Sequence, residues 1–152
     1  MKPVRNSCKA VIVQDRKVLL TKNRDDFGFF HLFPGGGQEP GETLTEALAR
    51  ECMEEVGAEI QVVDLIHIRE YIGKNHEFAQ WDADVHQVEF YFRCHLRDPH
   101  ATITDGTNPD ANQVAVEWID IDELHRIRLY PKTLGKIIAE EIRMNVYLGD
   151  IN

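Results

Sequence analysis

The chain has 152 residues, 43% hydrophobic and 28% charged, which predicts one domain with a substantial core. Its net charge of −9 and its pI near 5.2 argue against a nucleic-acid backbone or an anionic membrane as the main partner. A small phosphorylated substrate is not excluded, because a bound metal ion can reverse the local charge.

The cysteines and the N-terminus indicate the compartment. Cys8, Cys52 and Cys94 lack C-x-x-C spacing, so we expect neither a disulfide framework nor a zinc site, and a reducing cytoplasm is the simplest inference. Residues 1–6 lack the apolar core of a signal peptide, and no apolar run approaches the ~18 residues of a membrane-spanning helix. We therefore expect a cytoplasmic protein without a membrane partner.

The first predicted elements are two β-strands, 8–14 and 17–22, joined by a turn at 15–16. We expect a loop over 23–31 that carries Arg24, Phe27, Phe29 and Phe30. Aromatic rings beside a basic residue can stack on a nucleobase and pair with a phosphate. The alternative is that the rings fill the edge of the core, since aromatic residues dominate core burial.

A Gly-rich turn at 35–41 leads into the best-defined helix. Thr43 is a favourable N-cap, Glu46 completes a capping box, and Gly57 follows the last turn as a C-cap. The spacing therefore predicts a helix over 43–56.

Glu51, Glu54 and Glu55 share one face of this helix at i, i+3 and i+4. Like charges this close repel and raise each other's pKa, which a hard dication would relieve. The alternative is a solvated acidic face, because glutamate is a good helix former. The preceding glycines, which allow close backbone approach to a ligand, favour a phosphate and metal site.

The rest of the chain completes a layered arrangement. The predicted elements are a strand at 59–71, a polar loop at 73–84, a strand at 85–96, a turn-rich connection at 97–112, a strand at 113–119, a short helix at 121–127 and an amphipathic helix from Pro131 to about Met144. Strands interleaved with helices in this order favour an α/β fold.

The segment 36–58 resembles the Nudix box, G-x5-E-x7-R-E-U-x-E-E-x-G-U, in which U is a bulky aliphatic residue. All seven fixed positions match, at Gly36, Glu42, Arg50, Glu51, Glu54, Glu55 and Gly57. By chance such a match is on the order of 10⁻⁸ per starting position. The U positions depart from the pattern with Cys52 and Ala58, where we expect looser packing and unchanged chemistry. The flanks at 34–36 and 117–124 also resemble the family, although His31 stands where Trp is common.

The resemblance implies the Nudix fold, a mixed β-sheet sandwiched between α-helices (α/β/α), as a single domain over 1–152. It implies a Mg²⁺- or Mn²⁺-dependent pyrophosphohydrolase acting on a nucleoside diphosphate linked to a moiety X, such as a nucleoside triphosphate or a nucleotide sugar. It places the metal on Glu51, Glu54 and Glu55 with the Gly36 backbone nearby. Arg50 then positions the carboxylates, and Glu42 is partly structural.

The general base and the substrate-binding residues each have several candidates. Glu51 is the first choice of general base, and Glu77, Asp82 and Glu89 are candidates outside the box, although a single carboxylate is more often simply exposed. The candidate substrate-binding residues are Arg24, Phe29, His31, Gly35 and Gly37.

Two other functions stay open. A non-catalytic nucleotide-binding regulator on the same fold is the first, although it has less need of three clustered carboxylates. RNA 5′-end processing is the second, against which the net charge of −9 argues, because RNA affinity draws on basic surface. Many relatives are dimers, so a homodimer is also possible.

Overall fold

A curled, mixed sheet runs through the computed structural model, which describes residues 2–152. In chain order the elements are β1 (Arg5–Gln14), β2 (Lys17–Asp25), β3 (Gly28–Leu32), β4 (Gly35–Gly37), α1 (Leu44–Val56), β5 (Ile60–Ile72), η1 (Gly73–Asn75), α2 (Ala79–Asp82), β6 (His86–Leu96), β7 (Gln113–Asp120), η2 (Ile121–Arg126), β8 (Leu129–Tyr130), α3 (Lys132–Glu140) and β9 (Tyr147–Asp150).

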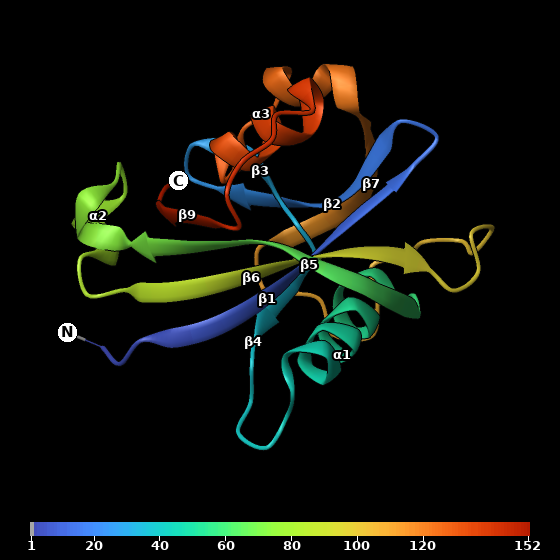
Figure 1. The fold of residues 1–152 in the computed structure, drawn as a ribbon, viewed down its shortest axis with the longest axis horizontal. Coiled ribbons are helices and arrows are strands. Elements are labelled where there is room, and N and C mark those ends of the chain that lie inside the picture. The colour runs from blue at the N-terminus through green and yellow to red at the C-terminus, as the bar shows by residue number, and fades with distance from the viewer. Residues whose placement is uncertain (1) are drawn as a thin grey trace.

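The sheet is mixed in direction. Its strand order is β8-β3-β2-β1-β6-β5-β9, with β4 paired to β1 and β7 paired to β2. The β1–β6, β3–β8 and β5–β9 pairs are parallel and the others are antiparallel. Figure 1 shows α1 on one side of this sheet and α3 on the other. The predicted α/β/α arrangement is therefore confirmed.

Two hydrophobic clusters hold the helices to the sheet, because β1 alternates its side chains between the two faces. Cys8, Ala10 and Ile12 pack with Leu48 and Cys52 of α1 in one cluster. The second cluster joins Val11, Val18, Leu20, Tyr91 and Leu129 of the sheet to Phe33, Leu124 and Leu134. All three cysteines are buried free thiols.

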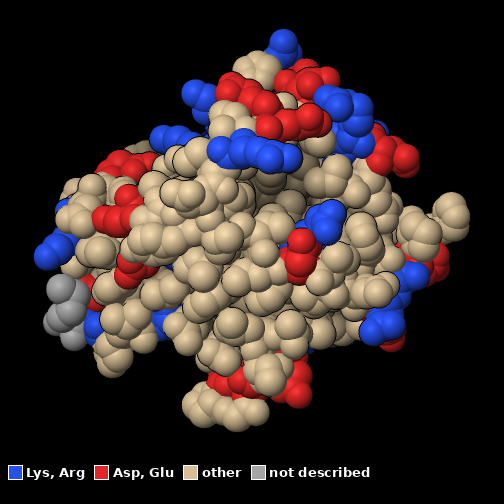
Figure 2. Space-filling model, in the orientation of Figure 1, with Lys and Arg blue, Asp and Glu red and all other residues tan. Residues whose placement is uncertain are grey.

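The surface carries charges of both signs. On the face in Figure 2, basic and acidic side chains intersperse over the α3 region, while the middle of the face is largely uncharged. Within residues 2–152, no helix combines the length and the apolar character needed to cross a bilayer.

The loop predicted over 23–31 is wrong, because most of it extends β2 and forms β3. The ladder pairs Asn23 with Phe30 and Arg24 with Phe29. The chain reverses at Asp25, whose Oδ1 accepts a hydrogen bond from the Phe27 N–H at 2.9 Å. Side-chain-capped turns of this kind close hairpins. Asp25, two residues before Phe27, was the signal in the sequence for this hairpin.

Three other predictions need correction. The 73–84 segment contains η1 and the short helix α2, and the Gly-rich turn contains the short strand β4. The last helix ends at Glu140 instead of about Met144, and β9 follows it. The Ile68 N–H donates to the Val146 carbonyl at 2.8 Å, so edge pairing with β5 takes over from local helix propensity. The 121–127 helix is present as the 3₁₀ segment η2.

Candidate active site

Local sequence fixes the position of α1. The Thr43 hydroxyl accepts from the Glu46 N–H at 3.2 Å, and the Glu46 carboxylate accepts from the Thr43 N–H at 2.8 Å. Gly57 ends the helix in the left-handed region at φ 66°. The predicted capping box and C-cap are confirmed, so the glutamates on the last turns have a defined place on the scaffold.

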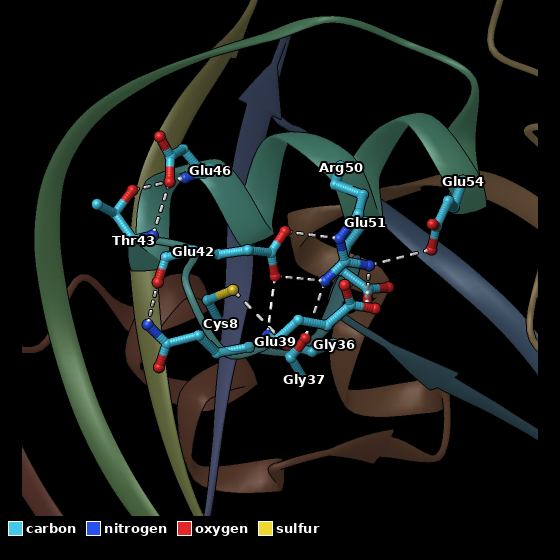
Figure 3. A network of polar contacts seen from close by, with 11 residues as sticks. Cys8, Gly36, Gly37, Glu39, Glu42, Thr43, Glu46, Arg50, Glu51 and Glu54 are labelled. Carbon is cyan, nitrogen blue, oxygen red and sulfur yellow. Dashed lines mark hydrogen bonds and ion pairs between the residues drawn. The ribbon is translucent and has the colours of Figure 1, made fainter.

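Arg50 organises the carboxylates around it (Figure 3). Its guanidinium donates to both Glu42 oxygens at 2.8 and 2.9 Å and to the Gly37 carbonyl at 3.0 Å. The same group reaches Glu51 at 3.0 Å and Glu54 at 3.4 Å. The Arg50 hydrogen bonds lower the pKa of Glu42 to about 2. Arg50 therefore ties the Gly-rich loop to the acidic face of α1.

Gly36 makes room for Glu51. A Cβ at position 36 would lie 2.6 Å from the Glu51 carboxylate, so the missing side chain forms a cradle for that group. Burial is the main cause that raises the pKa of Glu51, opposed by Arg50 and reinforced by Glu54 and Asp110. Desolvation thus contributes more than the repulsion within the cluster that the sequence suggested.

Glu55 is the most enclosed of the three, with 4% of its surface exposed. Its Oε2 accepts from the Gly35 N–H at 2.9 Å. Burial raises the pKa of Glu55 to about 8, with Asp110 adding to the effect and Lys9 and the Gly35 N–H opposing it. A carboxylate in this position is costly unless a cation offsets its charge.

The donor set fits a hard divalent cation, because carboxylate and carbonyl oxygens are the ligands of Mg²⁺ and Mn²⁺. Within residues 2–152, however, no three acidic, histidine or cysteine side chains stand in metal-binding positions. Arg50 engages Glu51 and Glu54, and the Gly35 N–H engages Glu55. Glu51 and Glu54 would have to turn from Arg50 to share one cation with Glu55.

A cleft of about 600 Å³ lies on the face of the sheet opposite α1. Its lining combines aromatic, acidic and amide side chains from β2, β3, β5, β6, the α2 segment and the β6–β7 connection. These residues are Asp25, Asp26, Phe27, Phe30, Leu32, Arg69, Tyr71, Phe78, Trp81, Asp82, Val85, Gln87, Glu89, Asn112, Tyr130 and Asn152.

Glu89 lies in this cleft but is fully engaged. It accepts from Arg69 Nε at 2.6 Å, from Gln87 at 2.7 Å and from the Tyr91 hydroxyl. Burial opposes its ionisation, but the charges of Arg69 and Lys9 outweigh burial and hold the pKa of Glu89 at about 2. A carboxylate with three donors and so low a pKa is a poor proton acceptor.

Four other predicted residues, Arg24, Phe29, His31 and Glu77, are absent from the lining of the cleft. Arg24 lies over the half-exposed Phe29 ring at 5.1 Å, and neither residue lines the cleft. His31 is buried and contacts Glu117 at 2.9 Å. Glu77 is exposed and pairs with Lys132 at 3.6 Å.

Gly35 and Gly37, which the sequence predicts to bind substrate, lie beside the carboxylates. The Gly35 N–H contacts Glu55, and the Gly37 carbonyl accepts from Arg50. Asp82 lines the cleft and accepts from the Tyr71 hydroxyl at 2.9 Å.

Sequence reasoning missed several residues. Asp110 lies near Glu51 and Glu55 but comes from a turn-rich connection without periodicity. Lys9 donates to the Gly35 carbonyl at 3.3 Å, and its charge lowers the pKa of both Glu55 and Glu89. The alternation of β3 was the available signal that Phe30, not Phe29, faces the cleft.

Comparisons with known proteins find relatives over most of the chain. A family model described as the NUDIX domain matches residues 4–140. A mouse protein named nucleoside diphosphate-linked moiety X motif 6 is 30% identical over 116 residues, covering 76% of this chain and 34% of the relative. A nucleoside triphosphatase named NudI from Enterobacter sp. (strain 638) is 26% identical over 137 residues, covering 82% of this chain and 93% of the relative.

The fold has solved counterparts. A NUDIX hydrolase from Nitrosomonas europaea superposes with a TM-score of 0.71 at 22% identity, covering 91% of this chain and 90% of that chain. The present chain spans 26–34% of the first three curated relatives it matches, so those whole proteins carry further sequence.

Proposed function

Because this chain belongs to the Nudix hydrolase family, we propose that it is a Mg²⁺- or Mn²⁺-dependent pyrophosphohydrolase acting on a nucleoside diphosphate linked to a moiety X. The observation that carries the proposal is the set of Glu51, Glu54 and Glu55 around the Gly35–Gly37 strand, with Glu55 buried as a carboxylate of raised pKa. Three clustered carboxylates of this kind would bind a divalent cation that in turn contacts the phosphates of the substrate.

The residues of the chain divide the work. Glu51, Glu54 and Glu55 would hold the divalent ion, which would supply neutralisation of the diphosphate charge and a more acidic water. Before the ion binds, Arg50 holds Glu51 and Glu54 beside the Gly-rich loop through the contacts described above. Glu51 is our choice of general base, because burial raises its pKa toward the working range. Glu89 is less suited, because its pKa is about 2.

The cleft supplies the second half of a substrate site. Its aromatic rings and its amides, Gln87, Asn112 and Asn152, suit a nucleoside or the X group. The names of the relatives, a diphosphate-linked moiety X protein and a nucleoside triphosphatase, support substrates of this class. A nucleoside triphosphate and a nucleotide sugar both fit that description.

The setting of the enzyme is also part of the proposal. We infer a single catalytic domain over 1–152, and the three buried free thiols support the cytoplasm as its compartment. A homodimer remains a prediction that sedimentation would test.

A phosphate-release screen over nucleotides and nucleotide sugars, with Mg²⁺ and with Mn²⁺, tests the function. Glu54→Gln should lower turnover at least ~10²-fold while far-UV circular dichroism stays unchanged, because an electrostatic contribution to catalysis is lost. Glu59→Gln, which removes an exposed charge just after α1, is the matched control and should retain turnover.

Near-normal turnover of Glu54→Gln would refute the assignment. Micromolar binding of one nucleotide without turnover of any would instead favour the non-catalytic regulator.

A further inference from the structure

Three aromatic rings at the cleft meet one another, and within residues 2–152 no cation lies over any of them. Phe27, from the β2–β3 turn, lies 5.9 Å from Trp81 and 6.5 Å from Phe78, and Phe78 lies 6.4 Å from Trp81, measured between ring centroids. The ring planes are inclined to one another by 45–67°. The Phe27–Trp81 contact is edge-to-face, and Phe78 also packs on the Tyr130 ring at 5.6 Å.

Two of these rings are unusually open for aromatic side chains, while Phe78 is partly buried. Phe27 is 65% exposed and Trp81 is 59% exposed, although both line the cleft. Exposed aromatic clusters of this kind mark binding surfaces. Elsewhere in the cleft the rings already have cations, because Arg128 lies over Phe30 and Tyr130 at 5.1 and 5.9 Å.

The charges around the rings are negative. Four carboxylates line the cleft against one cation, Arg69, which Glu89 neutralises at 2.6 Å. Arg128 pairs with Asp25 at 2.6 Å. Among residues 2–152, no ion pair engages Asp26, next to Phe27, or Asp82, next to Trp81.

We propose that Phe27, Phe78 and Trp81, with Asp26 and Asp82, form a cage for an organic cation, so that the nucleoside or the X group of the substrate carries a positive charge. The ring faces and the two carboxylates attract the same sign of charge. The chemistry fits an N-alkylated purine base or a quaternary ammonium group, both of which are soft, weakly hydrated cations. This inference rests on the proposed function, because the cage would hold one end of the molecule cleaved at α1.

Calorimetric titration without metal tests the cage apart from hydrolysis. In EDTA at about pH 6, where the methylated base is cationic, 7-methylguanosine is compared with guanosine. Choline is compared with its neutral carbon isostere, 3,3-dimethylbutan-1-ol. We expect at least 10-fold tighter binding of the cation in one pair, and the pair that responds tells the base from the ammonium group. Equal affinities, or no binding by any of the four probes, would overturn the proposal.

Variants locate the effect. Trp81→Leu keeps apolar bulk without a ring, and Asp82→Asn keeps an acceptor for the Tyr71 hydroxyl without charge. Each should reduce the cation preference at least 3-fold. Asp15→Asn removes the same charge from the β1–β2 turn, at φ 49°, and should leave the preference unchanged. If a variant weakened the binding of the cationic probe and of its neutral counterpart by the same factor, the result would contradict the cage.

The two proposals fail separately. A cation preference in EDTA with no Mg²⁺-dependent phosphate release would keep the cage and reject the hydrolase. Phosphate release from neutral substrates alone, without tighter binding of either cationic probe, would keep the hydrolase and reject the cage.

Discussion

Glu55→Gln should make the metal-free protein more stable. The amide keeps an acceptor for the Gly35 N–H and removes a negative charge from a site that also holds Asp110. In the unfolded chain this carboxyl loses its proton near the ordinary value of 4.5, whereas the folded protein retains the proton to about 8. The wild type therefore loses stability as pH rises from 4.5 to 8, and the variant does not.

The size of the effect follows from the pKa. A shift from 4.5 to about 8, at about 1.4 kcal/mol per unit, sets an upper limit of roughly 5 kcal/mol above pH 8. Relaxation of water and neighbouring groups lowers the expected gain for Glu55→Gln to about 2–3 kcal/mol.

Urea unfolding in EDTA at about pH 5 and about pH 8.5 measures the gain. The two proteins should be nearly equal at the lower pH and separate at the higher one. Glu59→Gln, at an exposed position, should follow the wild type at both. A Glu55→Gln protein that is less stable at the higher pH, or that differs equally at both, would refute the idea of a buried, uncompensated carboxylate.

Two further substitutions test the surrounding structure. Gly36→Ala places a Cβ 2.6 Å from the Glu51 carboxylate, so turnover should fall by ~10²-fold while the free energy of unfolding falls by only about 1 kcal/mol. Turnover within about threefold of wild type would refute the role of Gly36 as a cradle for Glu51. Arg69→Met leaves Glu89 buried without its cation and should lower the free energy of unfolding, measured in urea, by about 3–5 kcal/mol. The double variant Arg69→Met/Glu89→Gln should recover part of that loss. A loss below about 1 kcal/mol for Arg69→Met would show that the ion pair contributes little to stability.

The sequence predicts α1 and its acidic face well, because the signals are local. Thr43, Glu46 and Gly57 act within a few residues of themselves, and the structure contains the capping box and left-handed cap they predict. The contact of Arg50 with Glu54 follows from i,i+4 spacing in the same way.

Features that depend on distant segments could not be predicted as well. The burial of Glu55 depends on β4 and Asp110, which approach α1 from other parts of the chain. The strand β9 depends on the free edge of β5, against which local helix propensity is a weak guide. Phe29 was chosen over Phe27 and Phe30 because the hairpin that sets their directions was taken for a loop.

The central claim is that Glu51, Glu54 and Glu55 hold a divalent ion. A crystal of the protein grown with Mn²⁺, measured at an X-ray wavelength where manganese scatters anomalously, tests it most directly. We expect an anomalous peak bounded by oxygens of these three side chains, with Glu51 and Glu54 turned from Arg50. A Mn²⁺-saturated crystal whose peak lies elsewhere, with both ion pairs to Arg50 intact, would contradict the account.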